Sequence, residues 1–327
     1  MRIVLLGSRG QLGWELQRAL APLAELVALS TAGVEPHPAT LAAPAAAGAG
    51  ASRCDRNGHA APLVGDLRDA AGLRATLQRL QPAVIVNAAA YTDVDRAELE
   101  PESAAALNAH APGLLACEAA ALGAWLVHFG SDYVFDGSGD RAWTEDDSPA
   151  PLNTYGRSKL AGEQAVRAAG GRHLILRSSW LHAARGRNFV RTILRLAAER
   201  DRLEVVADQV GAPTGAQLLA DVSAHALRAA LAAPALAGTY HVAAAGETDR
   251  CSYARFIVAC ARAAGMPLRL RPEAIVPMVS AQRRAAATRP LNCRLDTSKL
   301  RQRFGLTLPD WRSGVARTVQ ELAGRAR

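Results

Sequence analysis

Short apolar runs alternate with helical patterns through the first half of the sequence. The helical patterns have an amphipathic period, and the apolar runs have the length of strands and carry few polar residues. Such alternation is typical of a parallel sheet whose two faces are both covered by helices, so we predict a doubly wound α/β domain over residues 1–180. The expected strands are Ile3–Leu6, Leu26–Leu29, Val84–Val86, Trp125–Phe129 and Leu174–Leu176, and the expected helices are Gln11–Leu20, Leu73–Leu80, Ala104–Leu122 and Ser158–Ala169.

The second half of the chain is less regular. Helical patterns occur at Phe189–Glu199, Ala216–Leu231 and Tyr253–Ala264, and residues 271–294 are rich in proline and arginine. We expect residues 181–327 to form mainly a smaller substrate-binding lobe, with some segments returning to the first domain. Residues 31–62 are rich in Ala, Pro and Gly without a helical or strand period, which predicts a long, flexible insertion.

Composition excludes several classes of function. The five cysteines are odd in number and scattered without a CxxC pair, which disfavours a zinc site and favours free thiols in a reducing compartment. The net charge of +8 is spread along the chain, so we expect no nucleic-acid partner. The apolar run at the N-terminus is too short for a signal peptide or membrane helix, and we expect a cytoplasmic protein.

A glycine-rich loop, Gly7-Ser8-Arg9-Gly10-Gln11-Leu12-Gly13, follows the first expected strand and opens the first helix. Glycines at this spacing let the backbone approach a pyrophosphate, whose charge then lies at the helix N-terminus. We predict a Rossmann-type dinucleotide site contacted by Gly7, Arg9, Gly10, Gln11, Leu12 and Gly13. A tight strand-to-helix turn without a ligand is the simpler alternative.

The second strand runs into Ser30-Thr31 and lacks the acidic residue that usually binds the ribose hydroxyls of NAD. Arg9 could instead face a 2′-phosphate, so we favour NADPH over NADH, although Arg9 could also simply face solvent. Further cofactor contacts are expected where strands end. Asp66 and Leu67 are expected to end one strand, and Ala89, Ala90 and Thr92 are expected to follow the next strand.

Tyr155 and Lys159 are four residues apart on an expected helix, so both side chains project from one face. A ketone that accepts a hydride needs a proton donor, and an ammonium group beside a tyrosine lowers the pKa of its hydroxyl. Lys159 is one of only two lysines among 38 basic residues. Ser131, after the strand Trp125–Phe129, is expected to hydrogen-bond the same carbonyl oxygen. The simpler alternatives are that Tyr155 and Lys159 form a pair on a helix surface and that Ser131 is a turn hydroxyl.

Several longer blocks carry a more specific resemblance. Together with the glycine loop, the sequence resembles the dTDP-4-dehydrorhamnose reductases, a family of extended short-chain dehydrogenase/reductases, over nearly its whole length. The blocks are residues 87–95 (NAAAYTDVD), 131–137 (SDYVFDG), 151–159 (PLNTYGRSK), 177–180 (RSSW), 188–190 (NFV), 208–214 (DQVGAPT) and 289–296 (RPLNCRLD).

The resemblance implies reduction of the C4 keto group of dTDP-4-dehydro-β-L-rhamnose, the last step in making dTDP-rhamnose for cell-surface polysaccharide such as O-antigen. It implies that Ser131, Tyr155 and Lys159 are catalytic. It further implies substrate contacts from Val94, Asp132, Tyr133, Trp180, Arg289 and Asn292, with Arg289 a candidate phosphate ligand.

The sequence departs from the family pattern at three places. The insertion at 31–62 is long, and Gly130 precedes Ser131 where many relatives have Ser-Thr. Some relatives form homodimers through glutamates around Mg²⁺. Glu15 and Glu321 match two of those glutamates, but Gln217 stands at the third position, which puts the metal in doubt.

Two other functions remain open at this point. An epimerase or 4,6-dehydratase of the same fold would need an added acid/base pair, yet Asp132 is followed by Tyr133 rather than by a glutamate. The regulatory subunit of methionine adenosyltransferase resembles this family but acts as a binding protein. Such a module would not require the set of Ser131, Tyr155 and Lys159.

Overall fold

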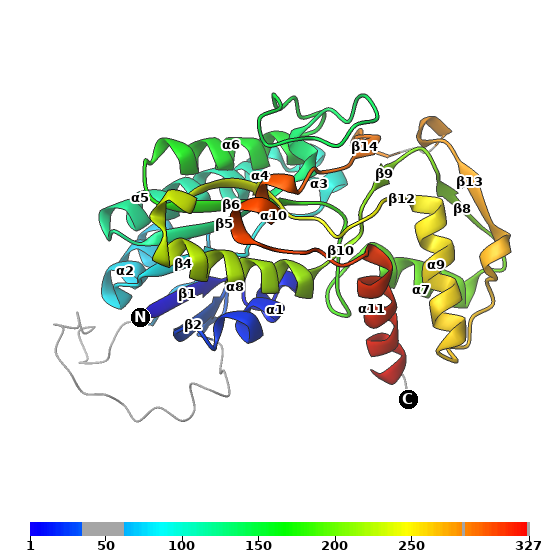
Figure 1. The fold of residues 1–327 in the computed structure, drawn as a ribbon, viewed down its shortest axis with the longest axis horizontal. Coiled ribbons are helices and arrows are strands. Elements are labelled where there is room, and N and C mark those ends of the chain that lie inside the picture. Colours follow the sequence, from blue (N-terminus) through cyan, green and yellow to red (C-terminus); the bar gives the residue numbers. More distant parts are fainter. Residues whose placement is uncertain (35–61, 283–284, 326–327) are drawn as a thin grey trace.

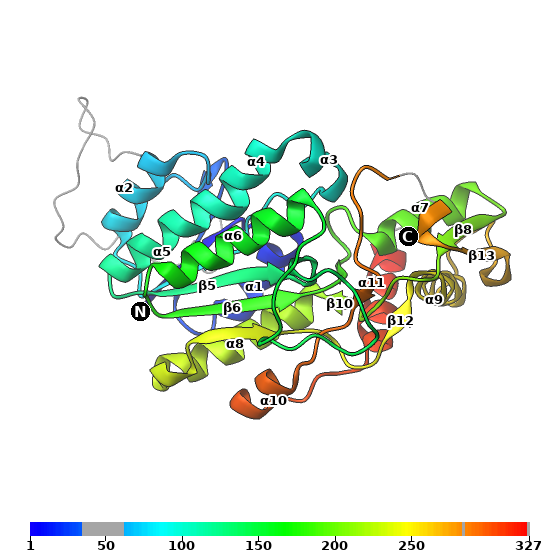
Figure 2. The same cartoon turned by 90° about the horizontal axis from the view of Figure 1, so that it is seen from above.

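The computed structural model describes residues 1–34, 62–282 and 285–325. Its main body is a seven-stranded sheet in the order β11-β6-β5-β4-β1-β2-β3 (Figures 1 and 2). Neighbouring strands pair in parallel, except that β3 runs antiparallel to β2. The strands are β1 (Arg2–Leu6), β2 (Glu25–Ser30), β3 (Gly33–Val34), β4 (Val84–Asn87), β5 (Trp125–Ser131), β6 (His173–Ser178) and β11 (Gly238–His241).

Each face of this sheet has its own hydrophobic core, because alternate side chains of a strand point to opposite faces. Ile3 and Leu5 pack with helices α1, α8 and α10, whereas Val4 and Leu6 pack with α2, α5 and α6. Figure 1 shows the two sets of helices on opposite faces, so the predicted doubly wound α/β fold is confirmed. These helices are α1 (Gln11–Leu20), α2 (Ala70–Leu80), α5 (Ala111–Ala121), α6 (Thr154–Ala168), α8 (Ala216–Ala232) and α10 (Ser298–Phe304).

Two expectations near the sheet edge were wrong. Residues 64–67 form no strand; the edge of β2 is instead taken by β3, which forms within the segment expected to lack strands. The backbone N–H of Val64 donates to Thr76 Oγ1 of α2 at 2.8 Å rather than to a strand. The remainder of the expected insertion, residues 35–61, lies outside the described residues.

The helix expected at residues 104–122 is interrupted. It consists of α4 (Pro101–Ala105), a π-helical turn (Ala106–His110) and α5. Pro112 stands in the first turn of α5 and has no N–H to donate to the preceding turn. The π-helical turn also places the side chain of Asn108 between Tyr91 and Ser158, with which it forms hydrogen bonds of 2.9–3.0 Å.

A second lobe is built around an aromatic and aliphatic core that includes Tyr253 and Trp311. The strand pair β8–β13 lies against its helices, and two small sheets, β12-β9-β14 and β7-β10, lie where this lobe meets the main body (Figure 1). The elements are β7 (Leu181–His182), α7 (Phe189–Glu199), β8 (Leu203–Val206), β9 (Val210–Gly211), β10 (Thr214–Gly215), β12 (Thr248–Asp249), α9 (Arg250–Ala263), β13 (Ile275–Met278), β14 (Asn292–Cys293) and α11 (Trp311–Arg325), with the 3₁₀ turns Pro272–Ala274 and Ser280–Gln282. Helix α3 (Val94–Leu99) and the 3₁₀ turns Asp132–Val134 and Pro234–Leu236 lie elsewhere in the chain. Over the described ranges, the helices are too short or too polar for any of them to span a bilayer.

Candidate active site

The glycine loop lies tightly against the end of β4. Gly7 has φ +79°, and a Cβ atom on it would come within 2.6 Å of the backbone nitrogen of Ala89. A Cβ on Gly13 would overlap the carbonyl oxygen of Gly7. Gly10 precedes the first turn of α1 and has no side chain to cover the free N–H groups there. The backbone therefore forms a cradle, at a helix N-terminus, that suits a pyrophosphate.

The side chains of the loop have different surroundings. Arg9 is exposed, whereas Leu12 is buried in the core between α1 and the sheet, so only the main chain of Leu12 is available to a ligand. Gln11 donates to the carbonyl of Arg187 at 3.2 Å and accepts from Asn188 Nδ2 at 2.7 Å. The expected cofactor loop is thus joined to the segment that leads into α7.

Further expected cofactor residues lie along the adjoining edge of the sheet. Asp66 accepts two hydrogen bonds from the Arg68 side chain, at 3.0 and 2.7 Å, which lower the pKa of its carboxyl group. Leu67 is buried in the hydrophobic core beside α2. The Asp66 carboxylate is therefore already engaged by a neighbouring cation in this structure.

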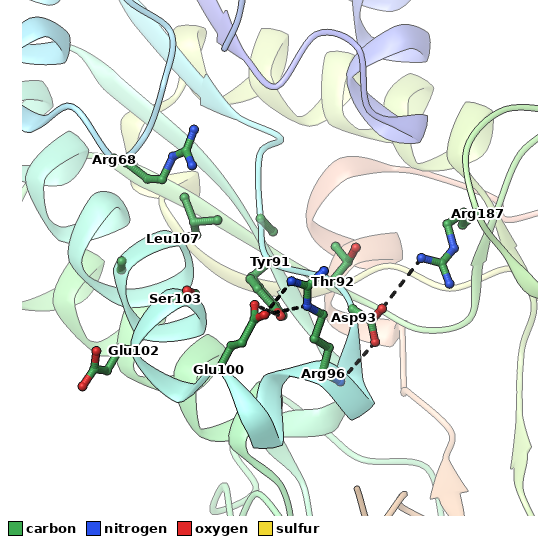
Figure 3. A pocket seen from close by; sticks show the side chains of 12 residues that line it. Arg68, Tyr91, Thr92, Asp93, Arg96, Glu100, Glu102, Ser103, Leu107 and Arg187 are labelled. Carbon is green, nitrogen blue, oxygen red and sulfur yellow. Dashed lines mark hydrogen bonds and ion pairs between the residues drawn. The ribbon is translucent and has the colours of Figure 1, made fainter. Parts of the chain in front are cut away.

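A cavity of about 650 Å³ opens beside the loop after β4 (Figure 3). Ala90 and Thr92 line it, together with charged side chains that include Arg68 and Arg187. Ala89 lies next to it, against Gly7. Ser131 and Tyr155 are not among the described residues that line this cavity.

The structure brings Ser131, Tyr155 and Lys159 together. Ser131 is the last residue of β5, and Tyr155 and Lys159 lie in the first turns of α6. The Ser131 hydroxyl is close enough to Tyr155 to act on the pKa of its phenol. Lys159 is buried, and its Nζ donates to the carbonyl of Phe129 at 2.5 Å. Helix α6 begins here because Asn153 caps it, accepting from the backbone N–H of Gly156 at 2.8 Å.

The expected effect of Lys159 on Tyr155 is not seen in this structure. Burial raises the pKa of Tyr155 to about 12, and the nearby hydroxyl of Ser131 only partly opposes this rise. Burial also lowers the pKa of Lys159 to about 8. The ammonium group is directed to the carbonyl of Phe129 rather than to the phenol, which is why desolvation dominates at Tyr155.

Asp132 and Tyr133 follow Ser131 in a 3₁₀ turn. Ser131 Oγ donates to Asp132 Oδ1 at 3.1 Å, and the ring of Tyr133 packs edge-on against Tyr155 at 5.6 Å between centroids. Burial raises the pKa of Asp132 to about 6, and the hydrogen bond from Ser131 and the nearby Cys293 thiol oppose this rise only in part. The sequence analysis did not single out Cys293 as a site residue, because it reaches Asp132 only through the pairing of β14 with β9.

Trp180 lies on the far side of this cluster. Its backbone is in the left-handed region at φ +47°, a conformation that costs a bulky residue energy. The guanidinium of Arg250 lies 3.6 Å from the centre of its ring. Arg250 was also absent from the predicted site, and no motif in the sequence marks it.

The other predicted substrate residues have protein partners. Arg289 forms hydrogen bonds of 2.6 and 3.1 Å with the Asp95 carboxylate. Asn292 is buried, and its amide donates to the carbonyl groups of Ser138 and Arg141, so it orders that loop. Val94, partly buried, begins α3 beside Asp95.

The residues named as candidate magnesium ligands do not come together within the described part of this chain. Glu15 on α1 is 3.6 Å from Arg18, and Glu321 on α11 is paired with Arg325. The third position carries Gln217, a neutral amide. Throughout residues 1–34, 62–282 and 285–325, no group of three or more His, Cys, Asp or Glu side chains is arranged to hold a metal ion.

Comparison with known proteins gives a consistent result. Residues 1–323 match the family model described as RmlD substrate binding domain. The chain is 45% identical over 322 residues to dTDP-4-dehydrorhamnose reductase of Escherichia coli K12, covering 98% of both chains. It is 40% identical to the Burkholderia thailandensis enzyme of that name, over 98% of this chain and 99% of that one.

A solved structure agrees with this. The crystal structure of dTDP-4-dehydrorhamnose reductase from Bacillus anthracis in complex with NADP has a TM-score of 0.79 and 31% identity, covering 98% of this chain and 99% of the other. The glycine cradle and the joined Ser131, Tyr155 and Lys159 are the features such an enzyme needs. The chain belongs to the dTDP-4-dehydrorhamnose reductase family.

Proposed function

We propose that this chain reduces the C4 keto group of dTDP-4-dehydro-β-L-rhamnose to give dTDP-β-L-rhamnose, with NADPH as the preferred reductant. The observation that carries the proposal is the convergence of Ser131, Tyr155 and Lys159 at the end of β5 and the start of α6. This trio lies beside a cradle for a dinucleotide. A ketone placed over Tyr155 would therefore face both the trio and the bound dinucleotide.

In the proposed reaction the cofactor supplies the hydride and the protein supplies the proton. When bound, the reduced nicotinamide supplies the hydride. Tyr155 then donates its hydroxyl proton to the oxygen on which negative charge develops, while the hydroxyl of Ser131 hydrogen-bonds the same oxygen. Lys159 holds the ribose and, once turned toward Tyr155, lowers the pKa of its phenol from the value of about 12 that it has in this structure.

The remaining site residues are assigned by the same proposal. Backbone at Gly7, Gly10 and Gly13 holds the pyrophosphate, assisted by the main chain of Gln11 and Leu12. The adenosine lies along the edge near Asp66, Leu67, Ala89, Ala90 and Thr92. The sugar lies between Val94, Asp132, Tyr133 and Trp180, with Arg289 and Asn292 shaping the wall that the smaller lobe contributes.

The preference for NADPH rests on Arg9. This arginine is exposed beside the pyrophosphate cradle, where it can approach a 2′-phosphate, and β2 ends in Ser30 rather than in an acidic residue. Arg9→Ala is expected to lower kcat/KM with NADPH and to leave kcat/KM with NADH nearly unchanged. Equal efficiencies of the unmodified protein with the two cofactors would contradict the assignment.

The cellular setting of the proposal is the cytoplasm. The described cysteines Cys117, Cys251, Cys260 and Cys293 are all free thiols, as expected in a reducing compartment. The proposed partner is a small dTDP-sugar rather than nucleic acid.

A coupled assay tests the function. NADPH oxidation is followed in the purified protein with dTDP-4-keto-6-deoxyglucose, in the presence and absence of the 3,5-epimerase that generates the unstable keto-sugar. Turnover that requires the epimerase is the expected result. Measurable NADPH binding without oxidation would refute the reductase and favour a binding module, while turnover without the epimerase would point to a different keto-sugar.

A further inference from the structure

Arg250 is an arginine in the substrate wall that the assignments above leave without a role. It is the first residue of α9, and its guanidinium lies 3.6 Å from the ring centre of Trp180 and 5.0 Å from that of Phe189. Its side chain is only partly exposed, and burial lowers the pKa of its guanidinium. A cation held over an indole at this distance makes a cation–π contact.

The small sheet β12-β9-β14 brings Arg250 to the site. Asp249 pairs with Val210 on one side of β9, and Cys293 pairs with Gly211 on the other. Gly211 lets the indole of Trp180 lie close to β9, since a Cβ there would be 3.0 Å from the ring. Arg250, which follows β12, therefore faces the same space as Cys293 and Trp180.

Among the described groups around Arg250, none forms an ion pair with it, although Asp132 acts on it electrostatically. Burial raises the pKa of Tyr133 and of the Cys293 thiol, so both are neutral at pH 7. Asp132 is near enough for Arg250 to lower the pKa of its carboxyl group. However, among the carboxylates that the structure describes, none lies within 4.0 Å of the guanidinium.

Arg289 provides the contrast. It also acts electrostatically on Tyr133, yet its guanidinium is 2.6 Å from a carboxylate oxygen of Asp95. A partly buried cation without an ion pair is costly unless a ligand supplies the opposite charge. Of the two arginines beside Tyr133, Arg250 is therefore the one whose charge remains available to a substrate.

We propose that Arg250 binds the diphosphate of the nucleotide-sugar, so that its guanidinium anchors the substrate while Trp180, on which it stacks, borders the sugar. This inference rests on the proposed function for the identity of the substrate. A guanidinium forms paired, charge-assisted hydrogen bonds with phosphate oxygens. Arg250 is thereby a specificity-determining residue that favours diphosphate-linked sugars over free sugars.

The test compares ligands that differ only in the diphosphate. Dissociation constants of dTDP and thymidine are measured for the full-length protein and for Arg250→Met, which keeps most of the packing on Trp180. A lost charge-assisted contact predicts that dTDP binds about 10- to 100-fold more weakly, whereas thymidine binding is unchanged. Arg250→Lys is expected to restore part of the dTDP affinity, because it restores the charge without the paired geometry.

Arg312→Met is the matched control. Arg312 also stacks on an indole, 4.7 Å from the ring centre of Trp311, but it is exposed and paired with Asp310. Its replacement should leave both dissociation constants unchanged. Equal weakening of dTDP and thymidine by Arg250→Met would show a purely structural role and overturn the proposal. Unchanged dTDP affinity in Arg250→Met, or no dTDP binding by the unmodified protein, would overturn it as well.

Turnover separates the two proposals. In an active enzyme, Arg250→Met should raise KM for the keto-sugar by the factor found for dTDP and change kcat little. If the unmodified protein binds dTDP through Arg250 but does not oxidise NADPH with the keto-sugar, the proposed reaction fails and the diphosphate site stands. If the keto-sugar is reduced with an unaltered KM in Arg250→Met, the reaction stands and the diphosphate site fails.

Discussion

Glu163, on α6, and Arg177, on β6, form a buried ion pair. The side chain of Glu163 is fully buried and that of Arg177 is 3% exposed, with 2.7 Å between Nη2 and Oε2. Nε of Arg177 lies 3.0 Å from both carboxylate oxygens. Glu163→Gln preserves the shape and removes the charge. Since it leaves a buried guanidinium without its counter-charge, we expect the free energy of unfolding to fall by about 3–5 kcal/mol.

The expected loss is large enough to measure against a surface pair of similar length. Arg18 and Asp221 are 2.6 Å apart, but their side chains are 51% and 45% exposed, so Asp221→Asn should cost about 1 kcal/mol or less. Urea unfolding of both variants and the unmodified protein gives the comparison. At about 2 °C per kcal/mol for a chain of this size, Tm should fall by roughly 6–10 °C for Glu163→Gln. Equal destabilisation by the two substitutions would refute the reasoning that burial, rather than distance, decides the loss.

Three further predictions concern activity. Burial lowers the pKa of the Lys159 ammonium to about 8, so this group loses its charge as the pH rises and kcat/KM should fall above about pH 8. Glu163 raises the pKa of Lys159, so Glu163→Gln should move this fall in kcat/KM to lower pH. An unmoved pH profile would contradict the electrostatic coupling between the two residues. Gly7→Ala should weaken NADPH binding in a fluorescence titration, since its Cβ would come within 2.6 Å of the Ala89 nitrogen at φ +79°; wild-type affinity would count against the cradle. Tyr155→Phe should lower kcat by about 10²–10⁴-fold with an unchanged Tm, and a variant that keeps most of the rate would exclude Tyr155 as the proton donor.

The parts of the fold that could be predicted depend on local signals. Phe189–Glu199 was predicted with its observed bounds, because its apolar period is strong and Asn188 caps it by accepting from Arg191 at 3.1 Å. The π-helical turn at Ala106–His110 was not predicted, since one extra residue in a turn hardly alters an apolar period. The short strand Gly33–Val34 depends on pairing with β2, which no local pattern reports.

The same distinction holds in the site. The spacing of Tyr155 and Lys159 places them on one helix face, so their proximity was predictable. The direction of Lys159 toward the carbonyl of Phe129 depends on how α6 packs on β5, and this packing is what leaves the pKa of Tyr155 high. Arg250 reaches Asp132 only through strand pairing between distant segments. Contacts of that kind have no signature in a single sequence.

The π-helical turn has a consequence for how this protein can vary in length. Deleting one residue from 106–110 would restore an ordinary α-helix and rotate one side of the segment by about 100° relative to the other. Asn108 would then leave Tyr91 and Ser158, with which its side chain makes hydrogen bonds of 2.9–3.0 Å. Those bonds join the loop before Thr92 to the helix that carries Lys159. Natural variants of this chain are therefore expected to gain and lose residues in surface connections but to keep the residue count of this turn.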